Sequence, residues 1–174
     1  MDIQPLEHIN NEFVRINKIL NESNTHLNQS IQDEMKDFFT KYMIIVIHGC
    51  FELELKRIIF FRVEKTNDAE VHSFIKNWIE GSKHFPIKVE SLKTYLKDFD
   101  PKYPNLFDKQ TTTEEKDLYT TFTNNRNLFA HGCAINVTYK ELVDNYPKML
   151  RVIKKFSAVL QSSHPLQHGK GDRR

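Results

Sequence analysis

The chain has 174 residues, of which 39% are hydrophobic and 28% are charged. This composition can bury enough apolar surface to fold, which excludes wholesale disorder. The 25 lysines and arginines nearly balance the 23 acidic residues, and the formal net charge of +2 excludes the strongly basic field that many nucleic-acid-binding proteins carry. Only 5 glycines and 6 prolines are present, too few for the many tight turns of a β-sandwich or barrel, so long helices are favoured.

Two helices are predicted in the first third of the chain. The first covers residues 4–21, where apolar residues alternate at spacings of three and four: Leu6, Ile9, Phe13, Ile16 and Leu20. The second runs from Gln29 to Phe61 and is apolar on nearly every side from Tyr42 onward, so we expect a central helix surrounded by others. A buried strand is the competing interpretation of its short apolar runs. The charged residues between those runs fit a helix with one polar edge better: Glu52, Glu54, Lys56 and Arg57.

Four further helices are predicted after residue 61. Two short ones cover residues 68–79 and 89–99, and glycines and prolines mark the loops around them: Gly81, Pro86, Pro101 and Pro104. A Thr-x-x-Glu capping box at residues 112–115 opens a helix to about His131, followed by Gly132 as a left-handed C-cap. A second capping box at residues 138–141 opens a helix to Leu160, with a break or kink near Pro147.

These elements predict an all-α fold. Residues 1–161 are expected to form a single helical bundle of about five to six helices with a long central helix. Residues 162–174 have no apolar periodicity and are predicted to be a disordered tail. No secretory signal and no apolar run of about 18 residues is evident, so we expect a soluble cytoplasmic protein that makes no membrane contact.

The two cysteines, Cys50 and Cys133, are too few for a disulfide framework. Each follows a His-Gly pair, which offers four potential zinc ligands. Residues two apart on a helix point about 200° away from each other, so neither tripeptide can chelate one ion from a helical backbone. We therefore expect no metal site and no cofactor.

The helix before Gly132 carries an unusual polar face. On a helical wheel its core stripe consists of Leu118, Phe122, Asn125 and Phe129. The opposite face holds Thr120, Asn124, Asn127 and His131, with Arg126 on the flank. Asn127 and His131 lie one turn apart, and the long Arg126 side chain can swing toward the same point, so the three can address one ligand group.

This polar face has an ordinary interpretation and a chemical one. In the ordinary one, His131 is an exposed residue that interacts with the helix dipole, and Arg126 pairs with an acidic residue. In the chemical one, the arginine stabilises an anionic phosphorane while the histidine moves a proton of an RNA 2′-hydroxyl or leaving oxygen, without a metal. One arginine and one histidine are few catalytic groups for a complete active site. Two copies across a two-fold axis would supply both a general acid and a general base.

Residues 126–132, Arg-Asn-Leu-Phe-Ala-His-Gly, resemble the Arg-x4-6-His motif of HEPN domains (higher eukaryotes and prokaryotes nucleotide-binding). Together with Gly-Cys-Phe-Glu at residues 49–52, the sequence is most similar to the RiboL-PSP-type HEPN subgroup. The resemblance implies an all-helical bundle that dimerises with two motifs facing one cleft. It further implies a metal-independent endoribonuclease that leaves a 2′,3′-cyclic phosphate and a 5′-hydroxyl, often as a toxin or phage-defence effector.

The same resemblance implies roles for individual residues. Arg126 would bind and polarise the scissile phosphate, His131 would transfer protons, and Asn127 would orient the phosphate or the histidine. Arg126 and Asn124 are the residues that we expect to contact RNA. Glu52 has two interpretations: it pairs with Lys56 one turn away, or it pairs with Arg126 and fixes the arginine's orientation.

Two other functions stay open at this point. Some HEPN domains are catalytically inert and bind RNA or a partner protein, and a purely structural bundle would carry Arg126 and His131 as surface residues. The expected partners of the leading hypothesis are RNA, a second copy of the chain, and a regulatory or antitoxin protein.

Overall fold

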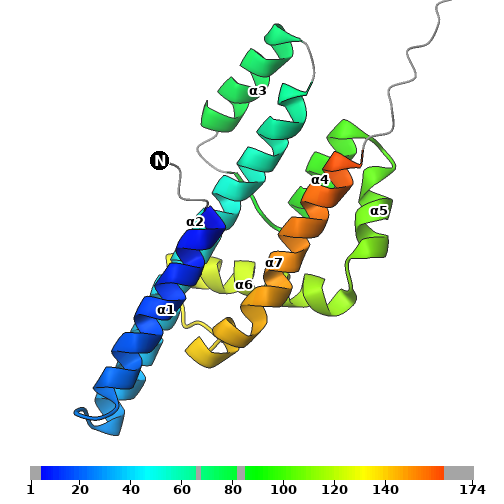
Figure 1. Ribbon diagram of the computed structural model, residues 1–174. Coiled ribbons are helices and arrows are strands. Elements are labelled where there is room, and N and C mark those ends of the chain that lie inside the picture. Colours follow the sequence, from blue (N-terminus) through cyan, green and yellow to red (C-terminus); the bar gives the residue numbers. More distant parts are fainter. Residues whose placement is uncertain (1–4, 66–67, 82–84, 163–174) are drawn as a thin grey trace, which may run out of the picture.

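The computed structural model describes residues 5–65, 68–81 and 85–162. Within these residues the chain forms seven helices and no strand, which confirms the all-α prediction and exceeds the predicted number by at least one. The helices are α1 (Pro5–Ser23), α2 (Gln29–Glu64), α3 (Ala69–Gly81), α4 (Val89–Phe99), α5 (Tyr103–Gln110), α6 (Thr113–Ala130) and α7 (Tyr139–Gln161) (Figure 1). Gln4, the predicted start of the first helix, and all of the predicted tail except Ser162 lie outside the described residues.

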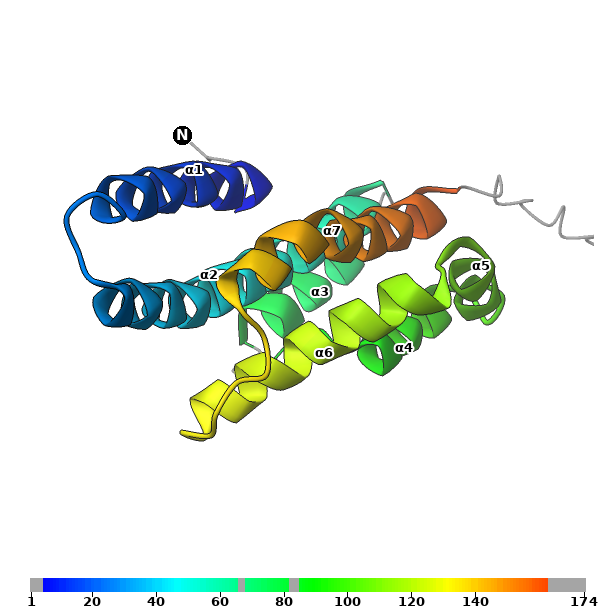
Figure 2. The ribbon, with the colours of Figure 1, turned by 90° about the horizontal axis from the view of Figure 1, so that it is seen from below.

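Helix α2 is the predicted central helix. It contacts α1, α3, α6 and α7, and its 36 residues make it the longest of the described helices. Figure 2 shows α2 and α7 between α1 on one side and α6 with α4 on the other. No helix in the described part of the chain is both long enough and apolar enough to cross a membrane.

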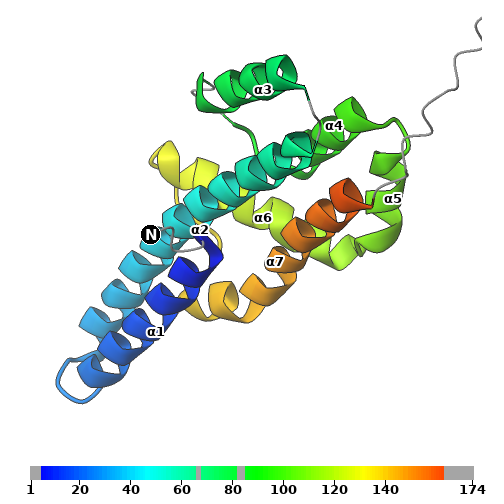
Figure 3. The same cartoon turned by 45° about the horizontal axis from the view of Figure 1, so that its top comes forward.

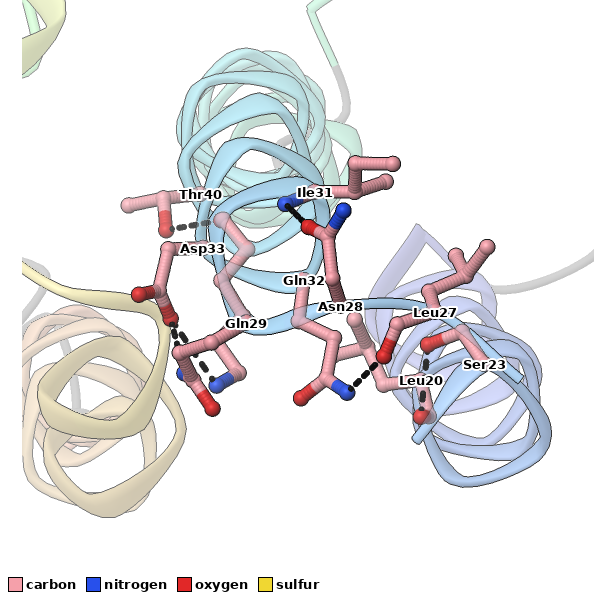
Figure 4. A network of polar contacts seen from close by, with 10 residues as sticks. Leu20, Ser23, Leu27, Asn28, Gln29, Ile31, Gln32, Asp33 and Thr40 are labelled. Atoms are coloured by element: carbon pink, nitrogen blue, oxygen red, sulfur yellow. Dashed lines mark hydrogen bonds and ion pairs between the residues drawn. The ribbon is translucent and has the colours of Figure 1, made fainter. Parts of the chain in front are cut away.

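The start of α2 is fixed by its cap. Asn28 accepts a hydrogen bond from the Ile31 N–H through its side-chain oxygen (3.1 Å), which satisfies one of the free N–H groups of the first turn (Figure 4). Gln32 donates from its side chain to the Leu27 carbonyl (2.8 Å), so the turn after α1 is tied to the new helix. These contacts turn the chain back on itself, and α1 packs along the first half of α2 (Figure 1).

The sequence pattern does not predict helix α5, because Pro101 and Pro104 mark a loop there. Pro104 lies in the first turn of α5, where a missing N–H costs no intrahelical hydrogen bond and the fixed φ suits a helix. Tyr103 and Phe107, one turn apart, are both buried and hold the short helix against the core. A proline therefore starts this helix rather than preventing it.

The core is centred on aromatic residues that join α2, α6 and α7. Phe51 of α2 stacks on Tyr119 of α6 (centroids 6.0 Å apart) and on Tyr146 of α7 (6.2 Å). A break or a kink is predicted near Pro147. Helix α7 is continuous through Pro147, so the break is absent, and the nearby Tyr146 and Met149 are both buried in the core. This packing fixes the position of α6, on which the candidate site depends.

Candidate functional site at the end of α6

Helix α6 begins at a buried and fully bonded carboxylate. Thr112 and Glu115 form the predicted capping box, in which the Glu115 N–H donates to Thr112 Oγ1 (3.2 Å) and the Thr112 N–H donates to Glu115 Oε2 (2.9 Å). Lys155 of α7 donates to the same carboxylate, and Arg151 Nε lies 3.4 Å from its other oxygen. Burial alone would raise the pKa of Glu115, but the hydrogen bonds from Lys155 and Thr112 outweigh it and hold that pKa below its ordinary value. This end of α6 is thus anchored on α7.

Helix α6 ends directly at the motif. His131 is the C-cap residue, and Gly132 follows with φ of 73°, a left-handed conformation that glycine adopts without a steric penalty. The Gly132 N–H donates to the Phe129 carbonyl (3.0 Å) and the Cys133 N–H to the Leu128 carbonyl (2.9 Å), the two bonds of a Schellman motif. The predicted glycine cap is confirmed, and it leaves His131 exposed at the end of the helix.

Asn125 shapes the loop after the motif. It is buried, with only 2% of its surface exposed, and its side-chain amide donates to the Thr121 carbonyl (2.9 Å). Its side-chain oxygen accepts a hydrogen bond from the Asn136 N–H (2.6 Å), which folds the chain after His131 back onto α6. The sequence placed Asn125 in the core stripe without a role. The signal was its polarity there, since buried amides nearly always have partners.

Helical spacing places Asn124, Asn127 and His131 on one face of α6, whereas Arg126 starts from the flank and is linked to that face by its contact with Asn127. His131 and Asn124 are exposed, whereas Arg126 and Asn127 are half-buried. Arg126 Nη1 donates to Asn127 Oδ1 (3.3 Å), and the His131 N–H donates to the Asn127 carbonyl (3.1 Å). Among the residues that the structure describes, Arg126 has no carboxylate partner within 4.0 Å. The ordinary interpretation predicts a pair between Arg126 and an acidic residue, and no such pair is present among the described residues.

Glu52 does not join this group. Its carboxylate accepts a hydrogen bond from Lys56 Nζ (2.7 Å), one turn along α2, and both side chains are partly buried. Of the two interpretations of Glu52, the pair with Lys56 is the one that the structure shows. The neighbour on the same helix is in reach without any tertiary arrangement, which favours this pair.

The predicted core stripe of α6 is correct at one edge and wrong at the other. Phe122 is buried, but Phe129 is only half-buried. Tyr119, which the stripe omitted, has no exposed surface because it stacks on Phe51. Phe129 instead lines a hollow of about 280 Å³ between the end of α6 and α2, together with Asp37, Lys41 and residues 132–135.

Other features of the surface do not coincide with the motif. A larger hollow of about 650 Å³ lies between the starts of α2 and α7, and neither Arg126 nor His131 lines it. The described residues contain no cluster of three or more His, Cys, Asp or Glu side chains able to hold a metal ion. Cys50 is buried and Cys133 is exposed, so the two His-Gly-Cys tripeptides lie in different surroundings.

Comparison with known families agrees with this geometry. The family model described as RiboL-PSP-HEPN matches residues 6–162. The chain belongs to this HEPN family. Neither the curated proteins nor the solved structures contain a match to it. The match spans all seven helices of this HEPN domain except the first residue of α1, and it includes the Arg126–His131 motif. HEPN membership, with an exposed His131 and a half-buried Arg126, is consistent with a nuclease-type or RNA-binding module.

Proposed function

We propose that this HEPN domain is a metal-independent endoribonuclease that acts as a toxin or phage-defence effector, with an active site composed of motifs from two copies. The observation that supports this most directly is the state of Arg126. The guanidinium is half-buried and has no carboxylate partner among the described residues, yet it lies five residues before the exposed His131. An arginine held by an amide alone keeps most of its donors for an anion such as a phosphodiester.

The chemistry follows from the types of these side chains. A neutral His131 accepts the proton of the RNA 2′-hydroxyl, and the 2′-oxygen forms a bond to phosphorus. Arg126 stabilises the negative charge that builds on the phosphoryl oxygens, and the Asn127 amide holds the guanidinium toward them. The bond to the 5′-oxygen then breaks, and a protonated His131 of the second copy donates a proton to it. The products are a 2′,3′-cyclic phosphate and a 5′-hydroxyl.

The composite site explains how so few residues per chain could suffice. General base and general acid must be in opposite protonation states at the same moment, which one histidine cannot supply within a single step. In this proposal Asn124, which is exposed on the same face of α6 as His131, contacts the RNA chain beside the scissile phosphate. The formal net charge of +2 provides little non-specific attraction for RNA, so a regulatory or antitoxin protein that controls access to substrate fits this function.

The test is cleavage of tRNA and mRNA by the purified chain in EDTA, followed by analysis of the fragment ends. We expect cleavage to persist in the chelator and to leave cyclic phosphate and 5′-hydroxyl ends, because Arg126 supplies the cation. Arg126→Ala should abolish it, whereas Arg15→Ala, which removes an arginine paired with Glu12 on α1, should not.

Two results would contradict the proposal. Loss of activity in EDTA that a divalent ion restores would show a metal-dependent mechanism. RNA that is bound but never cut, with binding weakened by Arg126→Ala, would show a catalytically silent HEPN module.

A further inference from the structure

One face of α2 is apolar, exposed and not covered by the described residues of the chain. Phe38, Ile45 and Leu53 are 64%, 44% and 58% exposed, and their spacings of seven and eight residues place them on one stripe of the helix. Gly49 lies between Ile45 and Leu53 on the same stripe and is also exposed. A continuous apolar stripe of this kind marks a protein-interaction surface more often than single exposed residues do.

No contact within the described part of the chain requires a glycine at position 49. A glycine in mid-helix costs about 0.5 to 1 kcal/mol relative to alanine. A Cβ atom added at this position would meet no other atom within 4 Å, so no neighbour in the described structure requires the glycine. A flat spot beside Ile45 and Leu53 suits the close approach of a helix from another molecule.

This apolar stripe lies beside the motif. Asp37 and Lys41 of α2 line the same hollow as Phe129 and Cys133, at the end of α6. Farther along, Phe122 of α6 packs edge-on against Phe51 of α2 (5.9 Å). Arg126 lies between Phe122 and Phe129 in α6, and therefore beside residues 41–51 of α2, level with Ile45 and Gly49. Figure 3 shows the end of α6 emerging on the side of α2 opposite to α7.

The charges along this edge of α2 can pair with the same charges of a second copy of α2 when the two helices are antiparallel. Two ion pairs flank the stripe, Lys41 with Asp37 (2.5 Å) and Lys56 with Glu52 (2.7 Å). At about 100° per residue the four side chains fall within one 100° arc of the helix. Read along the chain, they give the order negative, positive, negative, positive. An antiparallel copy of α2 reverses this order, so each of these four charges faces its opposite, whereas a parallel copy places like charges together. Glu34 lies in the same arc and faces the uncharged residues 58–60 of an antiparallel copy.

We propose that the α2 stripe binds the same stripe of a second copy in antiparallel orientation. Lys41 then faces Glu52 of the second copy, Asp37 faces Lys56 of the second copy, and Ile45 packs over Gly49 of the second copy. This register places the two-fold axis near residues 46 and 47, at the level of Arg126, so both motifs approach one cleft. The contact rests on the proposed function, because a site made of two motifs is incomplete in a single chain.

The test exchanges charges across the contact and measures the mass of the complete chain by sedimentation and light scattering. Lys41→Glu and Glu52→Lys each create two like-charge contacts in the symmetric dimer, so each should raise its dissociation constant by about tenfold or more. The double variant restores opposite charges between the copies and should recover dimerisation to within about threefold. Both ion pairs within the chain stay broken in the double variant, so rescue can come only from contacts between copies.

A substitution at Gly49 provides an independent test of the α2 contact. Gly49→Leu has room for its Cβ in its own chain and gains helix propensity, so thermal unfolding of the monomer should occur at the same or a higher temperature. The same side chain should prevent close approach of the second copy and weaken the dimer.

The outcomes separate this contact from the proposed function. A dimer whose mass responds to none of these variants, or a chain that stays monomeric, overturns the antiparallel α2 contact, whether or not RNA is cut. Rescue by the double variant supports the contact even if every RNA is left intact, and in that case it is the proposed ribonuclease activity that fails.

Discussion

The two ends of α6 differ in how their charged side chains are paired. At the start, the Glu115 carboxylate is 6% exposed and meets two cations of α7, Lys155 and Arg151. At the end, the Arg126 cation donates to the Asn127 amide and has no acidic partner in the described part of the chain, and the His131 side chain is exposed to solvent. A charge that stabilises a fold is neutralised within the chain, whereas a charge that binds a substrate must be left available. By that criterion the first end of α6 is structural, and we propose that the second end is functional.

The largest effect on the free energy of unfolding is expected from Glu115→Ala. The substitution removes half of the capping box and leaves two cations without their carboxylate, which together should destabilise the fold by about 2 to 3 kcal/mol. Chemical denaturation followed by circular dichroism measures it. The matched control is Glu114→Ala, since Glu114 is 64% exposed and pairs only with Lys148 on the surface. A loss of about 0.5 kcal/mol or less is expected there, and equal losses at both positions would contradict the comparison.

Asn125→Ala tests the hydrogen bond that holds the loop after the motif against α6. The variant leaves the Asn136 N–H without its acceptor and removes the tie between α6 and the loop after the motif. We expect a loss of about 1 to 2 kcal/mol, because a buried hydrogen bond is replaced by a gap. Asn124→Ala on the exposed face of the same turn serves as control for stability and should change it by less than about 0.5 kcal/mol. If both variants unfold alike, the loop is not held by Asn125.

The pH dependence of stability offers a smaller and more specific effect. The pKa of Glu115 in the folded protein lies below its ordinary value of 4.5, so its stabilising contribution is complete above that pH and is lost as the pH falls through the folded value. Glu115→Gln keeps the shape of the cap but cannot ionise. The stability difference between wild type and Glu115→Gln should therefore be greatest near neutral pH and shrink below about pH 4.5. A difference that stays constant with pH would show that the charge of Glu115 does not contribute.

Local rules predicted much of α6 from the sequence alone. The Thr112–Glu115 capping box and the Gly132 cap depend on residues three or fewer apart, so the sequence contains all of their partners. The same holds for the polar face of Asn124, Asn127 and His131, which follows from helical periodicity. The RiboL-PSP-type resemblance rested on these residues as well, and the family match confirms it.

Tertiary contacts account for what the sequence did not predict. The burial of Tyr119 and the half-exposure of Phe129 depend on where α2 crosses α6, which no helical wheel contains. Helix α5 was missed because a proline marks a loop or a first helical turn equally well. The sequence also does not predict that Arg126 has no carboxylate beside it among the described residues. Any of the 23 acidic residues could have reached it in the folded chain.

The smallest expected effect on stability belongs to His131→Ala, and it is paired with the largest expected effect on activity. His131 is exposed, and the helix end is fixed by backbone hydrogen bonds that any C-cap side chain permits, so the free energy of unfolding should change by less than about 0.5 kcal/mol. Cleavage should fall by about 10²- to 10⁴-fold, because both proton transfers depend on this imidazole.

The affinity for RNA distinguishes His131 from Arg126. His131→Ala leaves the guanidinium in place and should bind uncleaved RNA nearly as well as wild type, whereas Arg126→Ala loses a phosphate contact and should bind more weakly. His26→Ala, an exposed histidine in the turn before α2, should alter neither cleavage nor binding. If His131→Ala unfolds early, its lost activity reflects a structural role, and the division between the two ends of α6 is wrong. If it stays folded and still cuts RNA, the histidine is not the proton-transfer group, although Arg126 can still bind the phosphate.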